Sequence, residues 1–117
     1  MGERVLIVDD HAGFRGHARR LLECERYRVV GEAADCAAAL AAARALRPEL
    51  VLVDVHLPDG NGFELAERLA ALEEPPVVVL TSSRDGADLH AQVLESCARG
   101  FVPKAELSRE TIEELVR

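Results

Sequence analysis

Five polar residues of this sequence lie where short apolar runs end. Asp9 and Asp10 follow one run, Asp54 ends a second, Thr81 ends a third, and Lys104 follows a fourth. If these runs are parallel strands, their carboxyl ends lie at one edge of the sheet, where open parallel sheets place their ligand sites. Capping could explain any one of the five, but it does not easily explain all of them together. We therefore predict that the five side chains converge on one crevice.

Three carboxylates in one crevice repel one another. Two unit charges 4 Å apart interact by about 4 kcal/mol at an effective dielectric constant of about 20. Either the pKa of a carboxyl group rises or a cation binds. Oxygen ligands in a small acidic cluster suit Mg²⁺, which keeps several of its waters. We expect Asp9, Asp10 and Asp54 to be magnesium ligands, together with the backbone carbonyl of His56.

Such a site, balanced by Mg²⁺ and by Lys104, could admit a dianionic phosphoryl group. A carboxylate can act as a nucleophile toward phosphorus, and Asp54 lies centrally for that attack. Lys104 is the only lysine among 14 basic residues. Biased codon usage would explain this by accident, but a position that needs a compact ammonium would also explain it, because a planar guanidinium is no substitute. We favour the second explanation because Lys104 falls at a strand end.

Strands and helices alternate along the chain to position these residues. The predicted strands are Arg4–Val8, Arg28–Glu32, Leu50–Asp54, Val77–Thr81 and Gly100–Pro103. The run before Asp54 is continuously apolar, which is typical of a strand buried on both faces. Five strand–helix units predict an α/β fold, with a five-stranded parallel sheet, helices on both faces and right-handed crossovers. Pro103 cannot donate to a strand ladder, so the fifth strand should lie at an edge.

Capping residues and apolar spacing predict the helices between the strands. Asp35 should cap the second helix, Asn61 the third with Glu64 at its third position, and Ser108 the last. The residues expected to face inward at helical spacing are Phe14, Ala18, Leu21, Leu22, Leu40, Ala43, Leu46, Leu65, Leu69, Leu72, Leu89, Val93, Leu94 and Cys97. Leu107 and Ile112 should pack against each other around the last cap.

Composition limits the function classes. At 117 residues the chain is expected to be one domain, and its net charge of −7 argues against direct binding of nucleic acid by a basic surface. No run of 18 apolar residues is present, so no membrane span is expected. Three cysteines without metal-ligand spacing and the lack of a signal peptide favour a cytoplasmic protein with reduced thiols.

The whole chain resembles the response regulator receiver domains of two-component signal transduction. The matching segments are VLIVDD at 5–10, VLVDVHLPDGNG at 51–62, VVVLTSS at 77–83 and RGFVPK at 99–104. The resemblance implies a flavodoxin-like sheet of order 2-1-3-4-5. It also implies that Asp54 is the phosphoacceptor for a sensor histidine kinase or phosphotransfer protein, and that Asp9 and Asp10 bind Mg²⁺. Thr81 and Phe101 would be the switch residues, and Lys104 would contact the phosphoryl group.

The resemblance further implies a signalling domain spanning residues 1–117, with no output domain inside the chain. It would act on a downstream output domain or protein through its fourth helix, fifth strand and fifth helix. Dimerisation on phosphorylation is a further expectation. The stretch 31–34 resembles receivers fused to helix-turn-helix modules. The protein would not be an enzyme beyond catalysing its own phosphorylation and slow autodephosphorylation.

Three features depart from the family pattern. Phe101 stands where tyrosine is common, and Ala105 follows Lys104 where proline is frequent, so a cis peptide is not expected there. The segment from Thr81 to Lys104 is one residue longer than usual, which leaves the register of the fourth helix open. His56 is expected to be a half-exposed loop side chain, although the resemblance implies that it and Ser83 tune hydrolysis of the aspartyl-phosphate.

Two other functions stay open at this point. One is a receiver-like scaffold that never takes phosphate, although the acidic residues, Thr81 and Lys104 are all in place. The other is a phosphatase that forms an aspartyl-phosphate on a similar sheet. Such enzymes carry a second aspartate two residues after the nucleophile, where this chain has His56, and they carry a substrate-capping segment that is not found here.

Overall fold

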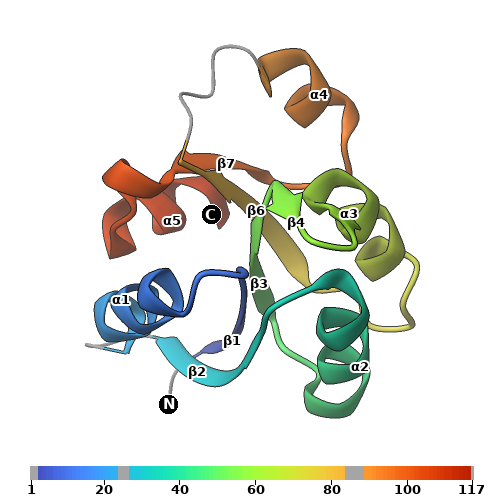
Figure 1. The fold of residues 1–117 in the computed structure, drawn as a ribbon, viewed down its shortest axis with the longest axis horizontal. Coiled ribbons are helices and arrows are strands. Elements are labelled where there is room, and N and C mark those ends of the chain that lie inside the picture. Colours follow the sequence, from blue (N-terminus) through green and yellow to red (C-terminus); the bar gives the residue numbers. More distant parts are fainter. Residues whose placement is uncertain (1–2, 24–26, 84–88, 117) are drawn as a thin grey trace.

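The computed structural model describes residues 3–23, 27–83 and 89–116, and all statements below refer to them (Figure 1). The five principal strands are β1 (Glu3–Val8), β2 (Tyr27–Ala33), β3 (Leu50–Asp54), β6 (Val77–Ser82) and β7 (Gly100–Pro103). The helices are α1 (Ala12–Leu22), α2 (Cys36–Leu46), α3 (Gly62–Ala70), α4 (His90–Glu95) and α5 (Arg109–Val116), with a 3-10 turn, η2 (Lys104–Glu106), before α5. Two very short strands, β4 (His56–Leu57) and β5 (Gly60–Asn61), form a hairpin after β3.

The five principal strands form one parallel sheet of order β2-β1-β3-β6-β7. In terms of the five predicted strands this is 2-1-3-4-5, so the predicted fold class and strand order are confirmed. β3 lies at the centre, where all five of its residues are buried, as its unbroken apolar sequence predicts. β7 lies at an edge and pairs only with β6 in the described structure, in agreement with the position of Pro103.

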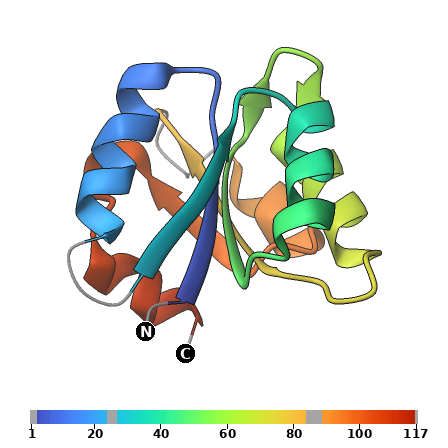
Figure 2. The same ribbon diagram turned by 90° about the horizontal axis from the view of Figure 1, so that it is seen from below.

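Helices cover both faces of the sheet (Figures 1 and 2). Successive strand residues alternate between two apolar clusters, because neighbouring side chains of a strand point to opposite faces. Leu6, Val8, Val51 and Val53 join the cluster that α2 and α3 cover. Residues at the intervening positions, such as Ile7, join the cluster that contains residues of α1 and α5. The sheet is therefore buried on both faces and its strand ends are fixed relative to one another.

The predicted helix caps are confirmed. The Asp35 carboxylate accepts a hydrogen bond from the Ala38 N–H at 2.8 Å, and the Asn61 side chain accepts one from the Glu64 N–H at 2.9 Å. The Ser108 hydroxyl accepts one from the Thr111 N–H at 3.1 Å, at the start of α5. Leu107 and Ile112 are buried in one cluster, as expected for the apolar pair around that cap. These caps fix where α2, α3 and α5 begin.

A second carboxylate also caps α2, from a distant part of the chain. Asp59, in the turn of the β4–β5 hairpin, accepts hydrogen bonds from the Cys36 N–H at 2.8 Å and the Ala37 N–H at 3.1 Å. These bonds hold the pKa of Asp59 below its ordinary value. The residue pattern predicted neither this hairpin nor this contact. The turn after β3 is consequently tied to the first turn of α2.

Three predicted core positions are wrong. Leu46, the last residue of α2, is 40% exposed, and Leu94 in α4 is 71% exposed. Cys97 is exposed and lies beyond α4, which has only six residues. A helix of six residues makes fewer than two turns, and of the four apolar residues predicted for it, Leu89 and Val93 join the core cluster or pack against it in the described structure. The peptide between Lys104 and Ala105 is trans, because the described chain has no cis peptide bond.

No helix within the described ranges is both long and apolar enough to cross a lipid bilayer.

Candidate functional site

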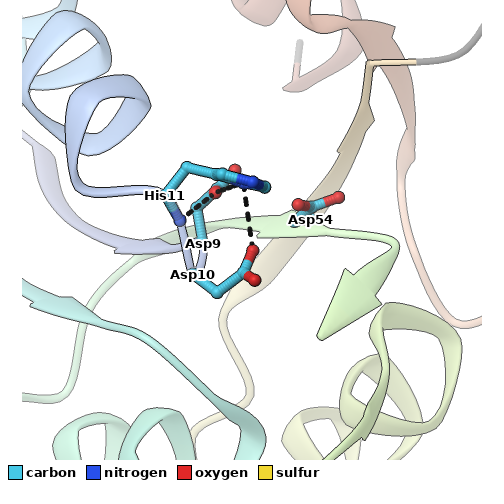
Figure 3. A group of neighbouring side chains, drawn as sticks. All are labelled: Asp9, Asp10, His11 and Asp54. Atoms are coloured by element: carbon cyan, nitrogen blue, oxygen red, sulfur yellow. Dashed lines mark hydrogen bonds and ion pairs between the residues drawn. The ribbon is translucent and has the colours of Figure 1, made fainter. Parts of the chain in front are cut away.

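The predicted site residues come together at the carboxyl edge of the sheet. Asp9 follows β1, Asp54 ends β3 and Lys104 follows β7. Asp54 lies beside Thr81 in the pairing of β3 with β6. Figure 3 shows the Asp54 carboxylate facing the group formed by Asp9, Asp10 and His11. The predicted convergence of these polar residues on one place is therefore correct.

The Lys104 ammonium lies between two carboxylates. Its Nζ is 2.7 Å from Asp9 Oδ2 and 3.2 Å from Asp54 Oδ2. The same Nζ lies 4.6 Å from the centre of the Phe14 ring, a cation–π contact from α1. Burial lowers the pKa of Lys104, but its hydrogen bond to Asp9 and the charges of Asp54 and Asp9 outweigh burial and leave this pKa raised. The lysine therefore stays charged and joins β1, β3 and β7 at the site.

Asp54 is a buried carboxylate with defined partners on both oxygens. The residue is 4% exposed, its Oδ1 accepts a hydrogen bond from the His56 N–H at 3.2 Å, and its Oδ2 contacts Lys104. Burial raises the pKa of Asp54, and the nearby Asp9 charge raises it further. The His56 N–H and Lys104 act in the opposite direction but do not cancel the rise. Asp54 is thus oriented by its neighbours and electrostatically unfavourable in its charged form.

Asp9, Asp10 and His11 form the other side of the site. Asp9 is fully buried, whereas the Asp10 side chain is 38% exposed. One ligand atom from each of these three residues and from Asp54 lies within 4.8 Å of the others, a spacing that could hold a metal ion. His11 Nδ1 lies 3.2 Å from Asp9 Oδ1 and 3.1 Å from Asp10 Oδ1. The predicted acidic ligands are therefore close together.

Sequence reasoning missed the part played by residues of the β1–α1 connection and of α1. His11 contacts both acidic side chains, Phe14 contacts Lys104, and the Arg15 Nη1 donates to the Asp9 carbonyl oxygen at 2.5 Å. Phe14 was assigned only to the core, and no role was given to the other two. Their position in the sequence could have indicated this role, because the residues directly after Asp10 must start a helix beside the strand ends.

The Thr81 hydroxyl is buried beside Asp54 without an internal partner. Thr81 is fully buried, and its Oγ1 has no hydrogen-bond partner within the described ranges. Its backbone is fixed, because the Thr81 carbonyl accepts a hydrogen bond from the Val55 N–H at 2.9 Å. Buried hydroxyls are normally satisfied, so an unpaired one invites a ligand or an alternative contact.

The remaining predicted residues lie near the site with less defined contacts. The His56 side chain is exposed and lies on the short strand β4, whereas a half-exposed loop side chain was expected; the role of its carbonyl as a metal ligand stays a prediction. Phe101 is half-buried and packs against the cluster that contains Leu89 and Val93. It pairs with Leu80, one residue before Thr81, in the β6–β7 ladder.

Gly62 allows the backbone to close tightly around the site. Its N–H donates to the Val55 carbonyl at 2.8 Å. A Cβ atom at this position would lie 2.6 Å from the Asp54 carbonyl oxygen and 3.0 Å from Val55 Cα. These are backbone atoms that cannot turn away, so only glycine fits next to Asp54 without moving β3.

The family model described as the response regulator receiver domain matches residues 5–117. The chain belongs to this family. Receiver domains of this family act in two-component systems, and the acidic site at the strand ends is compatible with Mg²⁺ and with an aspartyl-phosphate. The resemblance stated from the sequence is thus confirmed.

Solved structures and curated sequences similar to this receiver domain support the same family assignment. The signal receiver domain of NarL from Mycobacterium tuberculosis is 33% identical, with a TM-score of 0.85 over 97% of this chain and 96% of that one. A LuxR-family response regulator from Aurantimonas is 29% identical, with a TM-score of 0.85 over 98% of this chain and 86% of that one. The transcriptional regulatory protein YdfI of Bacillus subtilis is 31% identical, over 93% of this chain and 51% of its own length.

The receiver domain spans about half the length of the transcriptional regulators it matches, such as 53% of a Pseudomonas aeruginosa regulator that is 36% identical. It covers 24% of a protein-glutamate methylesterase/protein-glutamine glutaminase from Anaeromyxobacter dehalogenans that is 42% identical over 81 residues. Similar receiver domains thus occur in proteins of different named activities. The activity of each whole protein does not transfer to this chain.

Proposed function

We propose that this receiver domain is a phosphorylation-dependent switch whose phosphoacceptor is Asp54. The supporting observation is the environment of its carboxylate, which contacts the Lys104 ammonium and belongs to a residue paired with Thr81, whose buried hydroxyl has no hydrogen-bond partner among the described residues. A sensor histidine kinase or a phosphotransfer protein would supply the phosphoryl group. A downstream output domain or protein would receive the signal.

In the proposed transfer, a carboxylate oxygen of Asp54 attacks phosphorus while the bond from phosphorus to the donor's imidazole nitrogen breaks. The electron pair of that bond stays on the imidazole, and the product is an acyl phosphate on Asp54. Phosphoryl transfer depends mainly on positioning and on neutralising charge. The His56 N–H orients Asp54, and Lys104 is close enough to pair with a phosphoryl oxygen. The Thr81 hydroxyl would donate a hydrogen bond to another.

The residues present fit a magnesium ion. Asp9, Asp10 and Asp54 offer carboxylate oxygens within the spacing described above, which is the donor type that Mg²⁺ prefers. These three residues and the His56 carbonyl would hold it, and when bound it supplies positive charge that offsets the carboxylates and the incoming phosphate. Asp10 and His11 are exposed, which leaves a path for a hydrated cation.

The switch would run from Thr81 to the face formed by α4, β7 and α5. A phosphoryl group adds about two negative charges next to Thr81, and a hydrogen bond to it would draw the unpaired hydroxyl toward Asp54. Phe101 on β7 and Val93 on α4 pack against the same apolar cluster, and α4 contacts β7, so a shift of β6 would reach that helix through β7. Leu94 in α4 is exposed and available to a partner or to a second copy on phosphorylation. We expect no enzymatic activity beyond autophosphorylation and slow autodephosphorylation.

A direct test is intact-mass analysis after incubation with acetyl phosphate and Mg²⁺. The wild-type chain should gain one phosphoryl group, and Asp54→Asn should gain none. Glu67→Gln, which changes an exposed carboxylate on α3, is the control and should be modified like the wild type. An unchanged gain in Asp54→Asn would remove Asp54 from this role. No gain in the wild type, with no response to beryllofluoride either, would favour a scaffold that works without phosphate.

A further inference from the structure

His11 is placed so that its ring lies over the acidic residues (Figure 3). Its backbone is fixed on both sides, because its N–H donates to Asp9 Oδ1 at 2.8 Å and its carbonyl accepts from the Arg15 N–H at 3.1 Å. The ring nitrogen Nδ1 faces the two carboxylates, whereas the side chain as a whole is 70% exposed. The imidazole is therefore accessible to solvent and has one nitrogen directed at the acidic residues.

The spacing of the three nearest donor atoms matches one face of a metal site. Octahedral metal–ligand bonds of about 2.1 Å place neighbouring donor atoms about 3.0 Å apart. His11 Nδ1 lies 3.2 Å from one Asp9 oxygen and 3.1 Å from one Asp10 oxygen. Between an imidazole nitrogen and carboxylate oxygens at these distances, the species that can bind is a proton or a cation. Asp54 contributes a fourth donor to the same group.

We propose that His11 is a further ligand of this acidic site, besides the groups named for Mg²⁺, so that this receiver binds a first-row transition cation such as Ni²⁺ or Co²⁺ in preference to Mg²⁺. Oxygen donors alone suit Mg²⁺, whereas an imidazole nitrogen suits the later first-row metals. The inference concerns the same pocket as the proposed function and rests on its acidic ligands, but it does not require phosphorylation.

The test compares cation affinities of the tag-free full chain by isothermal titration calorimetry. Wild type, His11→Gln and the control His17→Gln are each titrated with NiCl₂ and with MgCl₂. His17 is also an exposed histidine, but it lies further along α1. Loss of an outer-shell partner alone lowers metal affinity about tenfold or more, so His11→Gln should weaken Ni²⁺ at least about tenfold and Mg²⁺ less than about twofold. His17→Gln should leave both affinities unchanged.

The ratio of the Ni²⁺ affinity to the Mg²⁺ affinity distinguishes metal ligation by His11 from a general effect of its charge. A protonated imidazole that only repels cations would make His11→Gln bind Ni²⁺ and Mg²⁺ more tightly by the same factor. An unchanged ratio of Ni²⁺ to Mg²⁺ affinity, whatever the direction of the individual changes, overturns the proposal. As a second readout, the Co²⁺ form should show paramagnetically shifted imidazole proton signals that are absent in His11→Gln, and their persistence in that variant would also overturn it.

These outcomes are independent of those for Asp54. A wild-type chain that binds Ni²⁺ through His11 but never gains a phosphoryl group would retain this inference and end the proposed function. If Asp54 is phosphorylated but wild type and His11→Gln have the same ratio of Ni²⁺ to Mg²⁺ affinity, the proposed function stands and this inference fails.

Discussion

Replacing Lys104 with methionine tests the electrostatic balance of the site. Methionine approximates the length of the lysine stem but carries no charge. The Asp9 and Asp54 side chains are 0% and 5% exposed, and that of Lys104 is 14% exposed. Water therefore cannot replace the ammonium at either carboxylate, and both would be left without their shared counter-charge.

The size of the effect follows from the two distances. At 2.7 and 3.2 Å, opposite unit charges attract by about 6 and about 5 kcal/mol at an effective dielectric constant of about 20. Desolvation of the lysine offsets much of this gross attraction, and breaking a buried ion pair by removing one partner costs about 3–5 kcal/mol net. We expect Lys104→Met to lose about that much unfolding free energy at pH 7.5 without divalent cations.

The assay is urea denaturation followed by far-ultraviolet circular dichroism in EDTA, because the chain has no tryptophan and one tyrosine. Urea slopes of about 1–3 kcal/mol per molar convert the expected loss into a midpoint lowered by at least about 1 M. Arg47→Met is the matched control. It removes an arginine from a pair with Glu74 whose side chains are 69% and 75% exposed, and exposed pairs contribute about 0–1 kcal/mol.

Two further measurements test this interpretation. The double variant Lys104→Met/Asp9→Asn removes one of the two carboxylates that lack a counter-charge and should recover part of the lost unfolding free energy. The loss should also shrink in acid, because the pKa of Asp54 is raised by burial and loses the lowering effect of Lys104 in this variant, and a protonated Asp54 no longer needs a counter-charge. A Lys104→Met midpoint that matches the Arg47→Met control, or a loss independent of pH, would refute the reasoning.

Two other predictions concern Asp54 and the glycine beside it. The pKa of Asp54 is raised in the folded chain, so its contribution to the free energy of unfolding is complete below the unfolded pKa and is lost as pH rises through the folded pKa. Asp54→Asn resembles the protonated form of the residue. This variant should therefore raise the urea midpoint at pH 7.5 in EDTA, with a gain that disappears in acid. An equal gain at both pH values would contradict this. Gly62→Ala should lower thermal stability and phosphorylation together, since its Cβ would meet backbone atoms of Asp54 and Val55. Gly13→Ala on α1 has open space and should instead stabilise the chain by about 0.5–1 kcal/mol, so two variants with the same thermal shift would count against the packing argument.

The sequence was sufficient for the sheet and for the acidic residues because both depend on local patterns. The apolar run that ends at Asp54 and the caps Asp35, Asn61 and Ser108 each determine their own neighbourhood, and parallel pairing then places the strand ends together. Lys104, the one lysine of the sequence, directly follows the last predicted strand and supplies a positive charge to Asp9 and Asp54.

The remaining features depend on contacts between segments that no local pattern encodes. Phe14 has helical spacing typical of a core residue, and only the fold places its ring under Lys104. The error at Leu94 has a similar origin, since its spacing is apolar but α4 is too short to bury it. His11 follows two aspartates in the sequence, yet nothing there shows which way its ring points.

The Asp59 side chain connects two segments that lie far apart in the sequence. Its carboxylate ties the turn that follows β3 to α2, whose first residue lies 23 residues earlier in the sequence. A displacement of that turn would have to stretch two hydrogen bonds or pull α2 along with it. Movement of the β4–β5 turn after Asp54 is therefore coupled to the first turn of α2.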